Sequence, residues 1–404
     1  MALVPFEIGI VGCGVAGQAA ASFLADAGHR VTVLERFEQP HPVGAGLLLQ
    51  PTGLAVLRAL GLERDALSAG ARIDGLLGEN QWGIRVIDLA YCDLHPAAFG
   101  LGIRRSDLFD LLRRRLLAAG ARLVPGVEIV DVEREGARAV ALDRKAGRHG
   151  PFDLLVVADG THSALRQRVF PRARAPLYPW GCICATVPDP LASGAVRLLR
   201  QRFADTTTMM GILPVAPDAV TMFWSLRTRD LGPERPLDLE AVRQEALALW
   251  PEAASTIERA VSGGEFSRAT YRHVALPRSS EGPVVFVGDA AHGTSPQLGQ
   301  GANLGLLDAH ALARSLAEAG DLAQAMELFS RRRGASNRFY RSASHLLTPF
   351  FQSDSVPLAI LRDLLLRQAC QTPIVRPMLT GVLAGLRRGW LSAESLDTDG
   401  QYPL

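Results

Sequence analysis

The glycine-rich segment Gly12–Gly17 constrains the fold of this chain more than any other feature. An apolar run, Phe6–Val11, precedes it, and an Ala-rich stretch of helical character, Gln18–Ala27, follows it. A second apolar run, Val31–Leu34, then ends at the acidic residue Glu35. The order of strand, glycine turn, helix, strand and acidic residue predicts a βαβ unit that binds a dinucleotide.

Each residue of this motif has its own expected role. Gly12 permits a tight turn, Gly14 lets the backbone approach a pyrophosphate, and Gly17 lets the helix pack on the strand. Glu35 is placed to accept a hydrogen bond from a ribose hydroxyl, and its negative charge disfavours a 2′-phosphate. FAD or NAD therefore fits better than NADP. The alternative, a glycine-rich turn without a ligand, is disfavoured by the flanking strand, helix and acidic residue.

A second strand–loop–helix segment lies later in the chain. The apolar run Val284–Val287 leads to Asp289, a loop rich in Gly and Pro follows, and Gly301–Asn303 opens an Ala/Leu-rich helix. Ligands of open α/β sheets lie at the carboxyl ends of strands, and helix N-termini favour negative charge. The segment predicts a site for a hydroxylated ligand with an electron-rich end. Alternatively, Asp289 caps the following turn. We interpret His292 as a structural residue of the loop rather than an acid or base.

A third segment narrows the choice of ligand. The apolar strand Phe152–Ala158 leads into Asp159–Ser163 and then Arg166, which either contacts a nucleotide or stabilises the loop. With these three separated motifs in this order, the chain resembles the FAD-dependent aromatic hydroxylases. These single-component flavin monooxygenases include para-hydroxybenzoate hydroxylase and the ubiquinone-pathway hydroxylases. The resemblance extends over roughly residues 7–333 and implies FAD as the cofactor.

The resemblance also implies particular cofactor contacts. The residues expected at the ADP half of FAD are Gly12, Gly14, Gly17, Glu35 and Arg36. Those expected toward the phosphates and ribityl chain are Arg105, Asp159, Gly160 and Asp289, with Arg104 as an alternative to Arg105. Those expected beside the isoalloxazine ring are Pro296, Gly299, Gly301, Ala302 and Asn303, with Gly44, Ala45 and Gly46 backing the flavin. Asp159 and Gly160 are also expected to contribute to NAD(P)H binding.

The reaction that the resemblance implies is an NAD(P)H- and O₂-dependent hydroxylation. A flavin C4a-hydroperoxide would transfer an oxygen atom to an electron-rich aromatic or heteroaromatic substrate, such as a phenol or quinolone. NAD(P)H would bind transiently, because the chain has only one dinucleotide fingerprint. The motifs assign no catalytic acid or base. The alternatives are a flavin halogenase, a reductase of unsaturated lipids, and a non-catalytic FAD redox-sensing module. The only lysine, Lys145, lies in a polar stretch, which disfavours a tryptophan-type halogenase.

The pattern along the chain predicts an α/β fold with two interleaved domains and a helical tail. We expect a discontinuous, Rossmann-like FAD-binding domain at 1–73, 101–171 and 279–334, and a substrate-binding mixed β-sheet domain at 74–100 and 172–278. Residues 335–404 are expected to form a helical cap on the core, with a dimer surface or reversible membrane contact as alternatives.

The expected substrate domain contains strand-like runs and one helical stretch. The runs are 75–89, which offers two strands, then 180–187, 195–203, 206–213 and 219–226, and the helical stretch is 237–260, broken near Pro251. Residues that could line an aromatic substrate pocket are Phe203, Met209, Met210, Phe223 and Trp224. Ordinary strand core is the simpler interpretation of each one taken singly.

Composition excludes several other classes of function. The net charge of the 404-residue chain is +2, which gives no electrostatic footprint for nucleic acid. No apolar run reaches spanning length, so we expect no stable membrane insertion. The five cysteines form no CxxC or CxxxxC pair, which disfavours a dithiol flavin reductase. We expect a cytoplasmic monomer or homodimer without a metal, whose partners are a small aromatic substrate and O₂.

Overall fold

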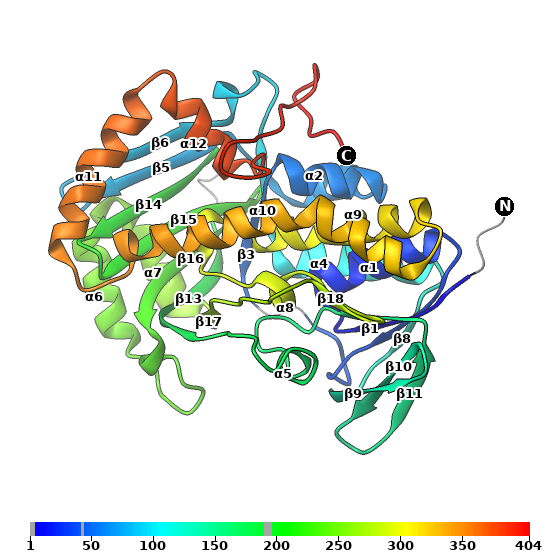
Figure 1. The fold of residues 1–404 in the computed structure, drawn as a ribbon. Coiled ribbons are helices and arrows are strands. Elements are labelled where there is room, and N and C mark those ends of the chain that lie inside the picture. The colour runs from blue at the N-terminus through cyan, green and yellow to red at the C-terminus, as the bar shows by residue number, and fades with distance from the viewer. Residues whose placement is uncertain (1–4, 42–43, 190–195) are drawn as a thin grey trace.

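Two β-sheets of different construction lie side by side in this protein, and one long helix, α10 (Leu322–Phe351), runs past both of them (Figure 1). The structure is a computed structural model that describes residues 5–41, 44–189 and 196–404. One sheet is mainly parallel and the other mainly antiparallel. The two sheets correspond to the two kinds of strand pattern in the sequence.

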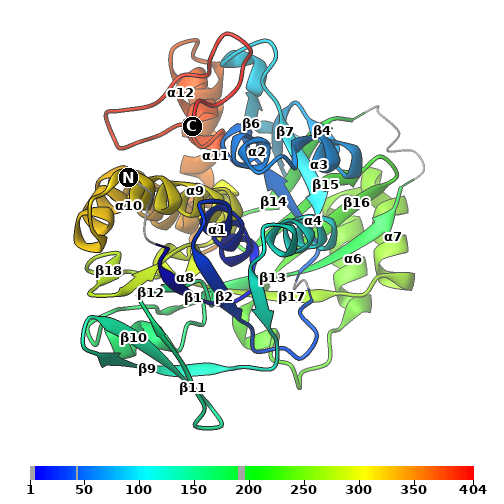
Figure 2. The same ribbon diagram turned by 90° about the vertical axis from the view of Figure 1, so that its right-hand side faces the viewer.

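The first sheet has six strands and is parallel except at one edge. Its order is β18 (Ser280–Glu281), β19 (Val284–Phe286), β12 (Leu154–Val157), β1 (Glu7–Val11), β2 (Arg30–Leu34) and β8 (Arg122–Val124). Helices α1 (Val15–Asp26), α4 (Arg105–Ala118) and α9 (Gly301–Glu318) pack on one face. The other face carries a three-stranded sheet of β9 (Ile129–Glu135), β10 (Arg138–Asp143) and β11 (Arg148–Phe152) (Figure 2). Both faces are buried, which explains the continuous apolar character of these strands.

The second sheet has seven strands. Its order is β17 (Ser267–Arg272), β13 (Leu177–Pro188), β16 (Ala219–Arg227), β15 (Thr208–Ala216), β14 (Leu198–Ala204), β5 (Gly75–Asn80) and β6 (Arg85–Ala90). Only the pairing of β14 with β5 is parallel. Helices α6 (Leu239–Leu249) and α7 (Ala254–Gly263) cover one face, which we call the back face. The opposite side, which carries Cys182, Cys184, Thr221 and Phe223, is called the front face.

A small third sheet joins the two larger ones. It consists of β3 (Gly46–Leu49), β7 (Gly100–Arg104) and β4 (Ala71–Ile73), and the helices α2 (Pro51–Ala59) and α3 (Glu63–Ala69) lie beside it. A Cβ atom at Gly46 would collide with the side chains of Thr221 and Val215, and one at Gly102 would collide with the Pro214 carbonyl. Glycine at these positions lets β3 and β7 approach the front face closely.

Several short elements complete the chain. The one-turn helices are α5 (Leu165–Val169) and α8 (Asp289–His292), and the 3₁₀ turns are η1 (Tyr91–Asp93), η2 (Thr228–Asp230), η3 (Pro251–Ala253) and η4 (Pro296–Leu298). At the C-terminal end, α11 (Val356–Gln371) and α12 (Val375–Leu383) follow α10. None of the helices in the described part of the chain combines the length and apolar character needed to cross a membrane.

The predicted fold class is confirmed, with local differences. The stretch predicted as a broken helix forms α6 and α7 on either side of Pro251. Helix α10 continues without interruption across residue 334, where we expected a boundary, and residues 384–404 contain no helix. Gly385, with a φ of +85°, lies just beyond the end of α12, in a backbone conformation that helices do not continue through. The expected strand start at residue 195 lies outside the described residues.

Candidate cofactor site

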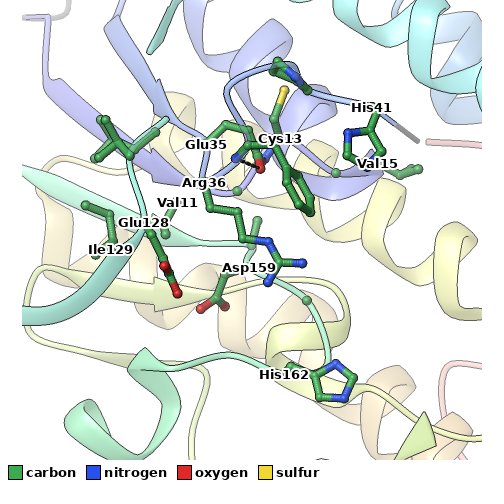
Figure 3. A pocket seen from close by; sticks show the side chains of 18 of the residues that line it. Val11, Cys13, Val15, Glu35, Arg36, His41, Glu128, Ile129, Asp159 and His162 are labelled. Atoms are coloured by element: carbon green, nitrogen blue, oxygen red, sulfur yellow. Dashed lines mark hydrogen bonds between the residues drawn. The ribbon is translucent and has the colours of Figure 1, made fainter. Parts of the chain in front are cut away.

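A pocket of about 250 Å³ opens where β1, β2 and β12 end, at the carboxyl edge of the parallel sheet. The predicted cofactor residues that line it are Gly12, Gly14, Glu35, Arg36, Arg105, Asp159 and Gly160. The side chains of Arg36 and Asp159 both point into it (Figure 3). The pocket therefore brings together residues from the first and third motifs, which are more than a hundred positions apart in the sequence.

The three glycines of the first motif differ in what surrounds them. Gly12 has a φ of +100°, and a Cβ there would lie 2.6 Å from the Ala158 carbonyl oxygen. A Cβ at Gly14 would meet no atom of the described residues within 4 Å, so this position opens toward the pocket. A Cβ at Gly17 would collide with the Gly12 carbonyl. Gly12 thus forms the turn, Gly14 leaves the backbone accessible from the pocket, and Gly17 permits the close packing of helix on strand.

Glu35 connects the glycine turn to the loop that follows β2. Its side chain is almost fully buried, and its Oε2 accepts a hydrogen bond from the Cys13 N–H at 2.7 Å (Figure 3). Its Oε1 accepts one from the Phe37 N–H at 3.0 Å. A carboxylate has about four lone-pair sites, so both oxygens retain capacity for a further donor. The expected hydrogen bond to a ribose hydroxyl stays a prediction.

Arg105 supplies a cation at the inner side of the pocket. Its Nε is buried and has no hydrogen-bond partner among the described residues. A Cβ at Gly44 would lie 3.2 Å from this Nε, so the Gly44–Gly46 stretch passes directly beside it. The neighbouring Arg104 instead lies within ion-pair distance of Asp107 and Asp218. An unpaired guanidinium beside an open glycine turn fits the pyrophosphate of a dinucleotide, because guanidinium groups bind phosphate oxygens strongly.

The Asp159–Arg166 segment forms the opposite wall. Burial raises the pKa of Asp159 to about 6. Arg166 is buried and donates hydrogen bonds to the carbonyls of Ala290, Thr161 and Gly160 at 3.1–3.2 Å. Its side chain therefore stabilises the loop, which was one of the two alternatives considered for it. His162 lines the pocket, and burial lowers its pKa.

The second motif lies outside this pocket. Asp289 is exposed at the end of β19, and α9 begins at Gly301 as predicted. A Cβ at Gly301 would lie 3.4 Å from the Asp289 Oδ1, so this carboxylate faces the start of α9. The predicted cofactor residues that do not line the pocket are Gly17, Gly44, Ala45, Gly46, Asp289, Pro296, Gly299, Gly301, Ala302 and Asn303. Their contacts with a cofactor stay predictions.

The Asn303 side chain has a structural role. It is fully buried, its Oδ1 accepts a hydrogen bond from the Gln50 N–H at 2.8 Å, and its Nδ2 donates to the carbonyls of Leu48 and Gly299 at 3.1 Å. It therefore holds the start of α9 against β3 and α2. The backbone at the helix start, rather than this amide, is the part available to a ligand.

The motifs did not identify Asp308, a fully buried carboxylate in α9. Its Oδ2 accepts hydrogen bonds from His292 Nε2 at 2.6 Å and from the Gly288 N–H at 3.0 Å. Its Oδ1 accepts from Arg333 Nε at 2.8 Å and from Asn337 Nδ2 at 3.1 Å. Asp308 thus fixes the loop that carries Asp289 to α9 and α10, and His292 is part of this structural network. The available signal was an aspartate within an otherwise apolar helical stretch.

The structure separates the five predicted substrate residues by face: Met210 and Trp224 lie on the back face, and Phe203, Met209 and Phe223 lie on the front face. Met210 and Trp224 are fully buried against α6 and α7, and their contact with a substrate stays a prediction. Neighbouring residues of a strand point to opposite faces, which turns Phe223 to the front face. Phe223 is half-buried there, whereas Phe203 is buried and packs edge-to-face on Phe351 with ring centroids 5.3 Å apart.

The family model for the FAD binding domain matches residues 6–328 of this chain. The chain therefore belongs to this family, and the expected resemblance to the FAD-dependent aromatic hydroxylases is confirmed. Within the family it is an FAD-dependent monooxygenase of the aromatic-hydroxylase group.

Individual relatives match most of the chain. The 3-amino-4-hydroxybenzoate 2-monooxygenase of Streptomyces cremeus is 32% identical, and the match covers 94% of this chain and 96% of the relative. A probable 2-heptyl-3-hydroxy-4(1H)-quinolone synthase of Rhodococcus erythropolis is 28% identical, with 80% and 82% covered. The tetrameric form of 2-methyl-3-hydroxypyridine-5-carboxylic acid oxygenase has the same fold, with a TM-score of 0.77, 22% identity and coverage of 93% and 98%.

Proposed function

We propose that this protein uses FAD, NAD(P)H and O₂ to hydroxylate an electron-rich aromatic or heteroaromatic small molecule. The observation that carries the proposal is the pocket at the carboxyl edge of the parallel sheet. The glycine turn at Gly14, the guanidinium of Arg105 and the buried carboxylate of Glu35 all line this pocket. Membership of the monooxygenase family supports the same conclusion.

In this proposal the pocket holds the dinucleotide half of FAD. Gly12 and Gly14 give the pyrophosphate access to the backbone, Arg105 pairs with a phosphate, and Glu35 accepts a hydrogen bond from a ribose hydroxyl. The N-terminus of α9, beginning at Gly301, then stabilises negative charge at the electron-rich end of the flavin. Bound FAD would supply the electron transfer and the oxygen chemistry.

The protein's own contribution is to orient the reactants and to exclude water. The front face of the seven-stranded sheet lies against β3 and β7, on the side from which the Gly44–Gly46 stretch approaches. We assign the aromatic substrate to this face, because its half-buried Phe223 offers a ring for stacking. Exclusion of water from the site strengthens electrostatic interactions and protects the reacting groups.

The test is aerobic oxidation of NAD(P)H by the purified, FAD-loaded protein with a panel of phenols, quinolones and indoles. We expect at least one compound to accelerate NAD(P)H oxidation and to yield a product that carries one added oxygen atom. Turnover that persists without O₂ would instead indicate a reductase. If FAD binds and no compound is oxygenated, the redox-sensing alternative replaces the hydroxylase.

A further inference from the structure

A thiol–hydroxyl cluster on the front face is not used by the cofactor site. The Cys182 Sγ lies 2.9 Å from the Tyr271 hydroxyl oxygen and 3.3 Å from the Cys184 Sγ. Both cysteines lie on β13, and Tyr271 lies on the neighbouring edge strand β17, two residues beyond the partner of Cys182 in the ladder. The cluster therefore joins two strands at one side of the front face.

The centre of the front face carries no charged side chain among the described residues. Its members on β13, β16 and β15 are Cys182, Cys184, Thr186, Thr221, Phe223, Ser225, Met209, Gly211 and Leu213. Cys184, Thr186, Phe223 and Tyr271 are only half-buried, so small molecules can reach this face. The surface offered to a ligand is thus one ring with thiol and hydroxyl groups around it.

Four arginines of the same sheet are engaged elsewhere. Arg200 and Arg202 on β14 lie over the Trp250 ring on the back face, at 5.2 and 5.3 Å from its centroid. Arg268 on β17 donates a hydrogen bond to the Gly232 carbonyl. Arg227, at the end of β16, lies 3.7 Å from the Trp180 ring centroid and pairs with Asp354. A fifth, Arg272 on β17, donates a hydrogen bond to the Ala175 carbonyl at 2.8 Å, while its buried Nε has no partner among the described residues. Each of these guanidinium groups already has an aromatic or hydrogen-bonding partner.

We propose that the front face selects an uncharged aromatic substrate, whose ring stacks on Phe223 and whose carbonyl or hydroxyl oxygen accepts a hydrogen bond from Tyr271. The inference rests on the proposed hydroxylase function and narrows its substrate class. A thiol is a weak hydrogen-bond partner, so the Tyr271 hydroxyl gains by exchanging Cys182 for an oxygen acceptor. Burial raises the pKa of Tyr271, which keeps its hydroxyl protonated as a donor.

Among the described residues at the centre of the front face, no side chain offers a cation to a substrate carboxylate. Burial of an unpaired carboxylate is strongly unfavourable. The nearest cation is Arg105, which lines the adjacent pocket and lies close enough to lower the pKa of Cys182; in our proposal it pairs with the cofactor phosphate and is not free for a substrate carboxylate. The names of two relatives differ in whether they include a carboxylate: one is a benzoate monooxygenase and the other a probable quinolone synthase. The front face favours an uncharged heteroaromatic of the second kind.

Matched substrate pairs test this inference. Each aromatic carboxylate, for example 4-hydroxybenzoate or a quinolone carboxylate, is compared with its methyl ester and with the parent ring that lacks the carboxylate. Binding is followed by the change in flavin absorbance, and turnover by NAD(P)H oxidation with product analysis. We expect the uncharged members to bind at least about tenfold more tightly than the acids.

Equal or tighter binding of the acids would overturn the inference while leaving the hydroxylase function intact. If neither member of any pair binds or is oxygenated, the hydroxylase function fails and the inference fails with it.

Tyr271→Phe tests the hydrogen bond separately. We expect KM for an uncharged substrate to rise about tenfold, with FAD content unchanged. Tyr178→Phe is the matched control, because Tyr178 lies on the adjacent strand β13 and donates its hydroxyl hydrogen bond to the Gln352 carbonyl. An unchanged KM in Tyr271→Phe, or equal effects in both variants, would show that Tyr271 does not hold the substrate.

Discussion

The cofactor pocket and the front face are built in different ways. The pocket consists largely of backbone turns, such as the one at Gly12, whose shape depends on a few neighbouring residues. The front face consists of alternate side chains from β13, β16 and β17, strands that are far apart in the sequence. Local sequence therefore encodes the first site, whereas the second exists only once the sheet has formed. Substitutions should accordingly separate cofactor binding from substrate binding.

Loss of the Asp308 carboxylate should have the largest effect. Asp308→Asn removes the charge that pairs with Arg333 at 2.8 Å, and this leaves a nearly buried guanidinium without its counterion. Breaking such a buried pair lowers the free energy of unfolding by about 3–5 kcal/mol. The same carboxylate accepts a hydrogen bond from the Gly288 N–H and so fixes the loop that carries Asp289. We therefore also expect weaker FAD retention. Urea unfolding and flavin content measure the two effects.

The control for Asp308→Asn is Glu318→Gln, which removes a half-exposed carboxylate from the same helix. Exposed ion pairs contribute at most about 1 kcal/mol, so this variant should unfold almost as the wild type does. Similar losses in the two variants would mean that the buried network does not support the pocket.

Two glycines of the same turn, separated by one residue, give the sharpest test within the pocket. Gly12→Ala places a Cβ at a φ of +100° and 2.6 Å from the Ala158 carbonyl, which we expect to lower the free energy of unfolding by about 2–4 kcal/mol. In Gly14→Ala the new Cβ meets nothing within 4 Å in the described part of the chain, so stability should be unchanged. That methyl group would still narrow the approach to the backbone and raise the FAD Kd about tenfold or more. If Gly14→Ala binds FAD as tightly as the wild type, the dinucleotide does not lie against this turn.

Neighbouring residues of β16 offer the same kind of test on the second sheet. Trp224→Phe shrinks a fully buried side chain on the back face and should cost about 1–2 kcal/mol of stability with KM unchanged. Phe223→Leu alters a half-buried ring on the front face and should raise KM several-fold with little change in stability. Denaturant unfolding and steady-state kinetics distinguish the two. A change in KM for Trp224→Phe alone would reverse the assignment of the faces.

The sequence predicted the parts of this molecule whose structure is decided locally. The glycine turn, the start of α9 at Gly301 and most strands of the two large sheets follow from short patterns, whereas β8, β17 and β18 were not predicted. The sheet of β9–β11 was not predicted, because its outer strands mix charged and apolar residues in the way that exposed loops do. The faces on which Met210 and Phe223 lie depend on strand register and on the position of α6 and α7, which no local pattern contains. The partners of Asp308 lie on separate elements and meet only in the folded chain.

The smallest expected effects are two opposite dependences of apoprotein stability on pH. One is due to Asp159 in the pocket and the other to His310 in α9. Burial raises the pKa of Asp159 to about 6, above its unfolded value of about 3.9, so the folded apoprotein holds this proton more tightly. Its contribution to stability is present below about pH 4 and is lost as the pH rises through about 6. His310, which packs on Phe23, has its pKa lowered to about 4 by burial and by Arg314 and Arg332. Its contribution is present above about pH 6.5 and is lost as the pH falls through about 4.

The two slopes oppose each other between about pH 4 and 6, and single substitutions separate them. Asp159→Asn should make apoprotein stability rise more steeply with pH in this window, because the stabilisation by Asp159, which declines as the pH rises, is removed. His310→Gln should make it rise less steeply, by about 1 kcal/mol across the window once solvent screening is considered. Urea unfolding of the apoprotein at several pH values measures both. FAD should change the slope due to Asp159 and leave that due to His310, because only Asp159 lines the pocket. If FAD changed both slopes equally, the pocket would not be energetically separate from the helices behind it.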